Sequence, residues 1–275
     1  MGTGTHRFTI GTMECISISD GSADGGKASV YFANAPQDEV AQALEAHGQQ
    51  ADALPQHFNI LYIKTGDRQI LVDTGSGDSG PPDVGLLMER LQGEGVNAGD
   101  IDTVIITHAH GDHIAGITDK DGDFNFPNAS YIIWKDEWTH WTSEEMLSSN
   151  RGEVLRAKLL PVESKLTLID NETEVAPGVC AIPAPGHTPG HMALLLDSGG
   201  ERLLHIVDAA HQVIQCEHPD WSPSFDSLPD MSPGTRKGLF DRAAKENLTV
   251  MAYHFPFPGL GHVVEKGDAW EWQPL

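Results

Sequence analysis

The sequence predicts an α/β fold in which two mixed β-sheets pack together and helices cover their outer faces. Short apolar runs rich in β-branched residues, each bounded by turn-forming residues, alternate with segments of helical periodicity. Hairpin-like pairs of strands flank these alternating segments, which indicates two packed sheets. No linker or low-complexity segment divides the chain, so we expect residues 1–275 to form a single domain.

The first third of the chain is predicted to contain three strands and a helix. Residues 8–19 alternate between apolar and polar side chains, as one antiparallel strand would. Residues 30–54 are rich in Ala and Gln, with Pro36 near a helix start. Residues 59–64 and 69–72 are expected to form two strands joined by a tight turn.

The remainder of the chain is expected to alternate between helices and strands. Helices are predicted at residues 84–91 and 135–150, and the run Thr-Val-Ile-Ile at 103–106 indicates a buried strand. The further predicted strands are residues 131–134, 166–169, 179–182, 192–196, 203–207 and 248–253. Several of these strands stop at residues of the kinds that bind metal ions, so their ends mark the candidate site.

The strand at 103–106 is followed closely by four ligand-type residues, which are His108, His110, Asp112 and His113. In an extended segment, residues two apart point the same way, so His108 and His110 can reach one point. Gly111 allows the chain to turn, and Asp112 can begin a helix. Asp112 and His113 then point in a different direction from His108 and His110. One strand end can therefore supply ligands to two neighbouring metal ions. The alternative is that these residues are ordinary surface residues of a polar loop. Four ligand-type residues within six positions, directly after a core strand, make that alternative less favoured.

Other strand ends carry further residues of the same kind. His187 lies in the Pro/Gly loop PGHTPGH, Asp208 follows the strand at 203–207, and His254 ends the strand at 248–253. Asp73 ends the strand at 69–72 in a glycine-rich loop. We interpret Asp73 as a carboxylate that orients a metal-bound histidine, with a turn or helix-cap role as the alternative.

The chain is strongly acidic, with 17 Lys and Arg against 40 Asp and Glu and a net charge of −23 when His is neutral. Such a surface repels phosphate backbones and anionic lipids, so we expect neither nucleic-acid nor membrane partners. Cys15, Cys180 and Cys216 are scattered and odd in number, as is typical of reduced thiols in a cytoplasmic protein. The polar N-terminal residues lack the apolar stretch of a signal peptide, so secretion would require a leader that has been removed.

This set of residues resembles the metallo-β-lactamase superfamily, through His-Ala-His-Gly-Asp-His at 108–113 followed by His187, Asp208 and His254 in the same order. The resemblance implies an αβ/βα sandwich with metal at one edge, and a homodimer. Carried over position by position, it implies a first metal on His108, His110 and His187. It implies a second metal on Asp112, His113 and His254, with Asp208 bridging both.

Two branches of that superfamily resemble the chain most. The run HFPFPGLGH at 254–262 and Phe-Asp-Ser at 225–227 look like methyl parathion hydrolase-like proteins. The third residue after the bridging aspartate is His211, as in those hydrolases. Acyl-homoserine lactone lactonases typically have a tyrosine there, which lowers the expectation of a dedicated lactonase without excluding lactones.

The ligand types predict the chemistry. Neutral imidazole and carboxylate suit two divalent ions such as Zn²⁺, with Mn, Co or Fe as alternatives. Two such ions roughly 3.5–4 Å apart lower the pKa of a shared water, and the resulting bridging hydroxide attacks a carbonyl or phosphoryl centre. We expect Asp112, Asp208 and His211 to be catalytic. His211 could polarise the substrate or protonate a leaving oxygen, with a packed supporting role as the alternative.

Aromatic residues near the motifs are candidates for a substrate pocket. Trp141, Phe255 and Phe257, together with His211, are predicted to line an apolar pocket for aromatic or acyl groups. The alternative is that these aromatic side chains belong to the core.

The sequence therefore predicts a dinuclear-metal hydrolase of aryl carboxylic esters and lactones, with organophosphate triesters as further substrates. We expect aryl esters and dihydrocoumarin-type lactones to be better substrates than long-chain acyl lactones, because aryl leaving groups need less acid assistance. An N-acyl-homoserine lactone lactonase is the first alternative. A non-catalytic metal-binding protein and an iron-dependent thiol oxygenase are the others.

Overall fold

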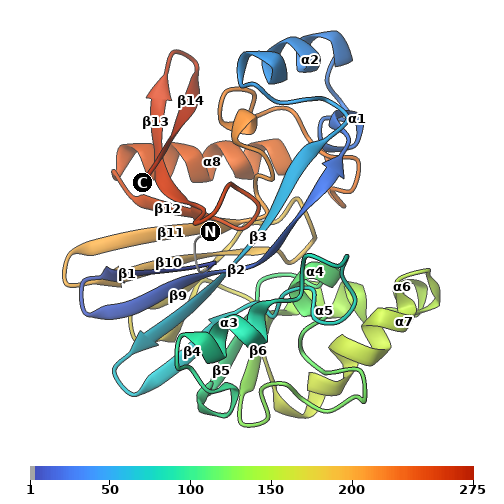
Figure 1. Ribbon diagram of the computed structural model, residues 1–275, viewed down its shortest axis with the longest axis vertical. Coiled ribbons are helices and arrows are strands. Elements are labelled where there is room, and N and C mark those ends of the chain that lie inside the picture. The colour runs from blue at the N-terminus through green and yellow to red at the C-terminus, as the bar shows by residue number, and fades with distance from the viewer. Residues whose placement is uncertain (1–3) are drawn as a thin grey trace.

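Two mixed β-sheets of seven strands each form the centre of the protein, and helices lie on either side of them (Figure 1). The computed structural model describes residues 4–275. The first sheet has the order β1 (Thr5–Ile10), β2 (Met13–Gly26), β3 (Leu54–Thr65), β4 (Arg68–Val72), β5 (Thr103–Ile106), β6 (Ser130–Trp134) and β7 (Leu166–Ile169). Its first four strands are antiparallel, and β4 to β7 run parallel.

The second sheet is built from the strands of the C-terminal part of the chain. Its order is β14 (Ala269–Pro274), β13 (Leu260–Lys266), β12 (Thr249–Ala252), β11 (Glu201–Val207), β10 (Met192–Ser198), β9 (Val179–Pro183) and β8 (Thr173–Ala176). Only the pair β11 and β12 is parallel among these described strands. The two sheets and their helices confirm the predicted αβ/βα sandwich.

Most of the helices are short, and several of them pack against strands of the two sheets. The α-helices are α1 (Ala28–Tyr31), α2 (Gln37–Ala46), α3 (Leu87–Gly93), α4 (Gly111–Ile114), α5 (Lys135–Trp141), α6 (Glu144–Ser148), α7 (Gly152–Val154) and α8 (Ser232–Lys245). The other helical segments are the 3-10 helices η1 (Ala98–Asp100), η3 (Leu160–Lys165) and η4 (Val213–Cys216) and the π-helix η2 (Leu155–Leu159). In the described part of the chain, no helix has the length and apolar character needed to cross a bilayer.

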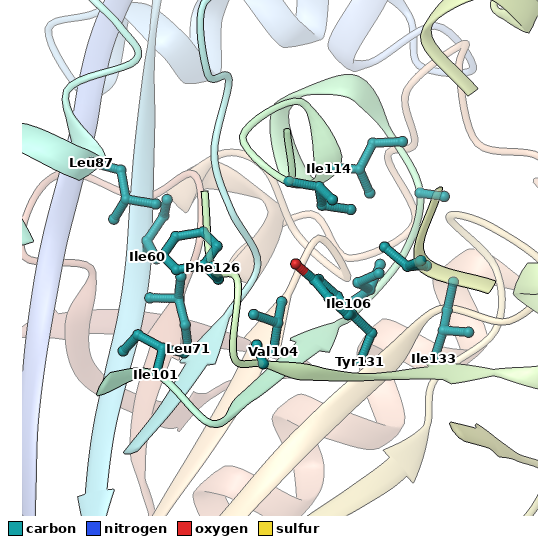
Figure 2. Close-up of a cluster of buried hydrophobic side chains, with 14 of the residues drawn as sticks. Ile60, Leu71, Leu87, Ile101, Val104, Ile106, Ile114, Phe126, Tyr131 and Ile133 are labelled. Atoms are coloured by element: carbon teal, nitrogen blue, oxygen red, sulfur yellow. The ribbon is translucent and has the colours of Figure 1, made fainter. Parts of the chain in front are cut away.

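Alternating side chains divide the core into layers, as a strand buried on both faces requires. On β5, Ile105 faces the other sheet, where it joins a cluster with Leu194 and Met251. Val104 and Ile106 point the opposite way, into a cluster that packs against the helices of the first sheet (Figure 2). Both faces of β5 are thus buried, and the segment after it begins at the edge of a packed sheet.

Two of the predicted elements are each divided in the structure, and α8, β8, β13 and β14 were not predicted. Residues 8–19 form parts of two strands, because Gly11 at φ +55° makes a tight turn that pairs Ile10 with Met13. Residues 135–150 form α5 and α6, because Ser143 accepts a hydrogen bond from the Met146 amide and begins a new helix. The strands predicted at 59–64, 69–72, 103–106 and 203–207 are confirmed.

Candidate metal centre

The seven predicted metal ligands lie together where both sheets end. β4, β5 and β6 run parallel, as do β11 and β12, so the carboxyl ends within each set meet at one edge. The ligands follow β5, lie in α4, lie in the loop between β9 and β10, and follow β11 and β12. In that order they are His108 and His110, Asp112 and His113, His187, Asp208 and His254.

Three imidazoles meet at one point in the first group. His110 Nδ1 lies 3.1 Å from His108 Nε2 and 2.8 Å from His187 Nε2. All three nitrogens belong to a set of ligand atoms within 4.8 Å of one another. Three imidazole nitrogens at this spacing can share one divalent cation, as three ligands of a tetrahedral site do.

A second group lies beside the first, and Asp208 lies between them. Asp112, His113 and His254 also place their ligand atoms within 4.8 Å of one another. Asp208 Oδ2 is 3.3 Å from His113 Nε2 and 3.1 Å from His254 Nε2 in this group. The same oxygen lies 3.6 Å from His108 Nε2 and 3.4 Å from His187 Nε2 in the other. One carboxylate therefore contacts both groups.

In three of the imidazole rings, the outer nitrogen has a partner that fixes which nitrogen faces inward. His113 Nδ1 lies 2.8 Å from Asp73 Oδ2, and His187 Nδ1 lies 2.9 Å from Asp226 Oδ1. His254 Nδ1 lies 2.8 Å from the carbonyl oxygen of His57. A proton on each Nδ1 leaves the Nε2 lone pair directed at the centre, which is the arrangement that metal-binding histidines require.

Asp73 lies where the sequence predicts it, next to a histidine of the site. Its buried carboxylate accepts hydrogen bonds from the Thr107 amide at 2.8 Å and the Thr107 hydroxyl at 2.7 Å, besides its contact with His113. It adopts φ +64°, an uncommon conformation for a residue other than glycine. Asp73 thus links the ends of β4 and β5 to His113.

The pKa shifts of His108 and Asp208 favour the forms that bind a metal ion, whereas burial would lower the pKa of His113 and His254 but the Asp208 carboxylate raises both. Burial lowers the pKa of His108 well below its usual value, and the neighbouring His113 lowers it further. Burial would raise the pKa of Asp208, but the imidazoles of His254, His113 and His108 hold it well below its usual range. A neutral imidazole and an ionised carboxylate are the forms that bind a metal ion.

The unsatisfied polar atoms of the site also fit metal ions. Asp208 Oδ1 and His113 Nε2 are buried and have no hydrogen-bond partner within residues 4–275. A buried polar atom without a partner costs about 1–3 kcal/mol. Two divalent cations shared by seven nitrogen and oxygen donors would satisfy these atoms, so the residues fit the predicted dinuclear centre.

Comparison with known proteins identifies the family. The family model described as the metallo-beta-lactamase superfamily matches residues 56–265, about three quarters of the chain. The chain belongs to the metallo-β-lactamase superfamily. It is a metallo-hydrolase of that superfamily.

Relatives within the superfamily include lactonases. An N-acyl homoserine lactonase from Bacillus sp. is 28% identical over 225 residues, which cover 74% of this chain and 80% of that protein. The solved structure of AidC, a dizinc quorum-quenching lactonase in complex with a product, has a TM-score of 0.90 and 29% identity, and the match covers 99% of this chain and 97% of that one. The hydrolase AbOPH has a TM-score of 0.91 and 26% identity, with 100% and 98% covered.

Glu137, which the sequence did not single out, connects the two histidine loops of this superfamily member. It is fully buried on α5 and accepts four hydrogen bonds. Their donors are the Ala109 amide at 2.9 Å, the Trp141 indole at 2.6 Å, the Thr188 hydroxyl at 2.7 Å and the Gly190 amide at 2.9 Å. Ala109 lies between His108 and His110, and Thr188 follows His187. One carboxylate therefore fixes the positions of three imidazoles.

Asp226 is a second residue whose contact with the site was missed. Besides His187, its carboxylate lies 3.9 Å from the buried Arg236 guanidinium, which also donates to the carbonyl oxygens of Ala209 and Pro219. The Phe-Asp-Ser motif at 225–227 was noticed only as a resemblance. A carboxylate directly after an aromatic residue of the pocket was the available signal.

A cavity of about 430 Å³ opens onto the metal centre. Besides ligands of both groups, it is lined by Tyr31, Gln56, Ala109, Gly111, Asn150, Arg151, Val154, Leu155, His211 and Phe225. His211 lies where it was predicted, 3.4 Å from Asp208 Oδ2 and stacked on His254, and both of its ring nitrogens lack partners among the described residues. The ring forms part of the cavity wall, and with His187 and Asp208 it makes a further group of possible metal ligands.

The three predicted pocket aromatics are placed elsewhere, which corrects the sequence prediction. Trp141 is buried beneath His110 and donates its indole N–H to Glu137. Phe255 is buried against Trp272 on the outer side of the second sheet. Phe257 is half-buried and, within residues 4–275, is not part of the cavity lining. The aromatic side chains that do line the cavity are Tyr31 and Phe225.

We expect Asp73→Asn to weaken metal binding by about 10- to 100-fold, because an amide can turn a donor toward His113 Nδ1 and disturb its orientation. Metal affinity is measured by competition with a chromogenic chelator. Asp67→Asn, an exposed change in the turn of the same hairpin, is the matched control. Equal affinities for both variants would contradict the role of Asp73.

Replacing Glu137 with Gln is expected to destabilise the fold by about 1–3 kcal/mol, because each carboxylate oxygen accepts two hydrogen bonds and the new NH₂ group would face two of these donors. Urea unfolding of the metal-free protein measures this directly. Asp136→Asn, at the exposed neighbouring position on α5, is the control. If Glu137→Gln unfolds at the same urea concentration as this control, Glu137 does not hold the two loops.

Proposed function

We propose that this protein is a lactonase that binds two divalent metal ions, with zinc as the proposed metal, and hydrolyses small lactones and related carboxylic esters. The observation that carries the proposal is the pair of ligand groups that share Asp208 and open into one cavity. The similarity to N-acyl homoserine lactonases and to a dizinc lactonase supports the lactone class.

The bound cations would supply an activated water and neutralise negative charge on the substrate oxygen. His108, His110 and His187 would hold one ion, and Asp112, His113 and His254 the other, with Asp208 contacting both. The other residues of the cavity would bind the substrate and transfer a proton.

His211 is the candidate for proton transfer to the leaving oxygen. Its ring lies in the cavity wall, neither ring nitrogen has a hydrogen-bond partner among the described residues, and Nε2 lies 3.4 Å from Asp208 Oδ2. The Gln215 side chain fixes the backbone of His211 by accepting from its amide at 2.7 Å. An imidazole can donate a proton near neutral pH, which an alkoxide leaving group needs more than an aryl oxide does.

The apolar part of the cavity fits the acyl portion of such a substrate. Val154, Leu155 and Phe225 line it beside the ligands. A cavity of this size and lining is typical of a small-molecule site. Activity on aryl esters and on phosphotriesters stays a prediction. The same centre could catalyse both reactions, because each needs charge stabilisation at one oxygen.

We expect the purified, zinc-loaded protein to hydrolyse lactones and to lose this activity when a chelator removes the metal. The assay compares dihydrocoumarin, an aryl ester, and N-acyl homoserine lactones of short and long chain. His254→Ala should lose at least about 100-fold in kcat/KM together with one metal equivalent, because it removes a ligand of one ion. His6→Ala, at an exposed position on β1, is the control.

Three results would reject the proposal. If elemental analysis shows that the metal has been removed and turnover is undiminished, the reaction does not depend on metal. Two bound metal ions without turnover of any ester or lactone would favour a binding protein instead, and oxygen consumption with a thiol would favour an iron oxygenase.

A further inference from the structure

Tyr31 brings a phenol into the cavity from the N-terminal segment, which precedes the residues matched by the family model. It is the last residue of α1, whereas the family match begins at residue 56. Its ring nonetheless lines the same cavity as Asp208 and His254. A residue of the N-terminal segment therefore takes part in the site of this particular chain.

The position of Tyr31 is fixed by its neighbours in the chain. The Ser224 amide donates to the Val30 carbonyl at 2.8 Å, and the Ala33 amide donates to the Ser222 carbonyl at 2.9 Å. These bonds join α1 to the loop before Phe225. Directly after Tyr31, Phe32 is fully buried and packs on Trp221 with ring centroids 5.7 Å apart. Tyr31 thus sits on a well-anchored segment.

The ring packs between aromatic groups of the cavity wall. It lies edge-on to Phe225 with centroids 5.5 Å apart, and its centroid is 6.1 Å from that of His211. A Cβ atom at Gly26 would lie 2.8 Å from Tyr31 Cε2, which is next to the carbon that bears the hydroxyl. The absence of a side chain at Gly26 therefore leaves room for the outer end of the phenol.

The hydroxyl of Tyr31 is a free donor. Tyr62 and Tyr253 each donate within the protein, to Gln69 Oε1 at 2.7 Å and to the Asp112 carbonyl at 2.6 Å. Among the described residues, no acceptor is bonded to the Tyr31 hydroxyl. Burial raises the pKa of Tyr31, and the carboxylates of Asp112 and Asp208 raise it further, so the phenol keeps its proton.

We propose that the Tyr31 hydroxyl donates a hydrogen bond to the carbonyl oxygen of the bound ester or lactone, and is a catalytic residue supplied by the N-terminal segment. The inference rests on the proposed function. Because the donor is neutral and already placed, it stabilises negative charge on that oxygen without transferring a proton. Its contribution is therefore independent of the leaving group, in contrast to that of a group that protonates the leaving oxygen.

The test is Tyr31→Phe, which removes the hydroxyl and keeps the ring that packs on Phe225. In the zinc-loaded protein we expect kcat/KM to fall by about 10- to 100-fold, equally for aryl and alkyl esters of one acid. Metal content and the melting temperature should stay as in the unaltered protein. Tyr62→Phe, which removes a hydroxyl outside the cavity, should leave kcat/KM unchanged.

Two further measurements separate this inference from the proposed function. Binding of hexanoate to the zinc-loaded protein, followed by calorimetry, should weaken about three- to tenfold in Tyr31→Phe, because a carboxylate oxygen accepts the same hydrogen bond. This readout needs no turnover. Gly26→Ala keeps the hydroxyl but displaces the ring, so it should lower kcat/KM in the same way.

The inference is wrong if Tyr31→Phe stays within twofold of the unaltered protein in both kcat/KM and hexanoate binding. It is also wrong if the loss grows as the leaving group becomes poorer, or if it accompanies loss of metal. If the unaltered protein binds hexanoate but hydrolyses no ester or lactone, the proposed function fails while the binding ratio still decides the role of Tyr31.

Discussion

The buried Asp208 carboxylate is the group on which the arrangement of the site depends. One of its oxygens lies within 3.1–3.6 Å of imidazole nitrogens of His108, His113, His187, His211 and His254. An ionised carboxylate removed from water is costly unless partners of opposite or potentially positive charge surround it. Those imidazoles lie in segments that follow strands of both sheets. The negative charge of Asp208 is therefore stabilised only when the edges of the two sheets lie side by side.

Further carboxylates surround the imidazoles and hold them in place. Asp73, Asp226 and Glu137 are buried, and each accepts hydrogen bonds from, or contacts, groups in the segments that carry the histidines. Their donors come from backbone amides, hydroxyls and ring nitrogens. The acidic composition therefore has a role inside the protein as well as on its surface, because ring orientation is set by these acceptors.

The sequence was sufficient where the signal was local. β5 is apolar and buried on both faces, and its ligands follow within a few residues, so both the strand and the candidate site could be predicted. Glu137 could not be found in this way. It lies on an ordinary helix, and three of its four donors come from loops that are 28 to 53 residues away in the chain.

Two other differences have equally physical reasons. The turn at Gly11 was hidden because alternation continues across a short hairpin, so the pattern resembles one long strand. The wall of the cavity was missed because composition does not say which way an aromatic ring points. Phe255 faces the outer core, whereas Tyr31, far away in sequence, faces the cavity.

Trp141 lies between Arg151, which lines the cavity, and His110, one of the predicted metal ligands. The Arg151 guanidinium stacks over its ring at 5.1 Å, while the edge-to-face contact with His110 lies at 5.4 Å. Remodelling residues near Arg151 to admit other molecules would therefore disturb the coordination sphere through this indole. Substitutions in the loop around Phe225 are a second way to change the cavity wall, but Asp226 in that loop contacts His187. Adaptation to new substrates in this scaffold is consequently coupled to retention of the metal, which limits the order in which substitutions can accumulate.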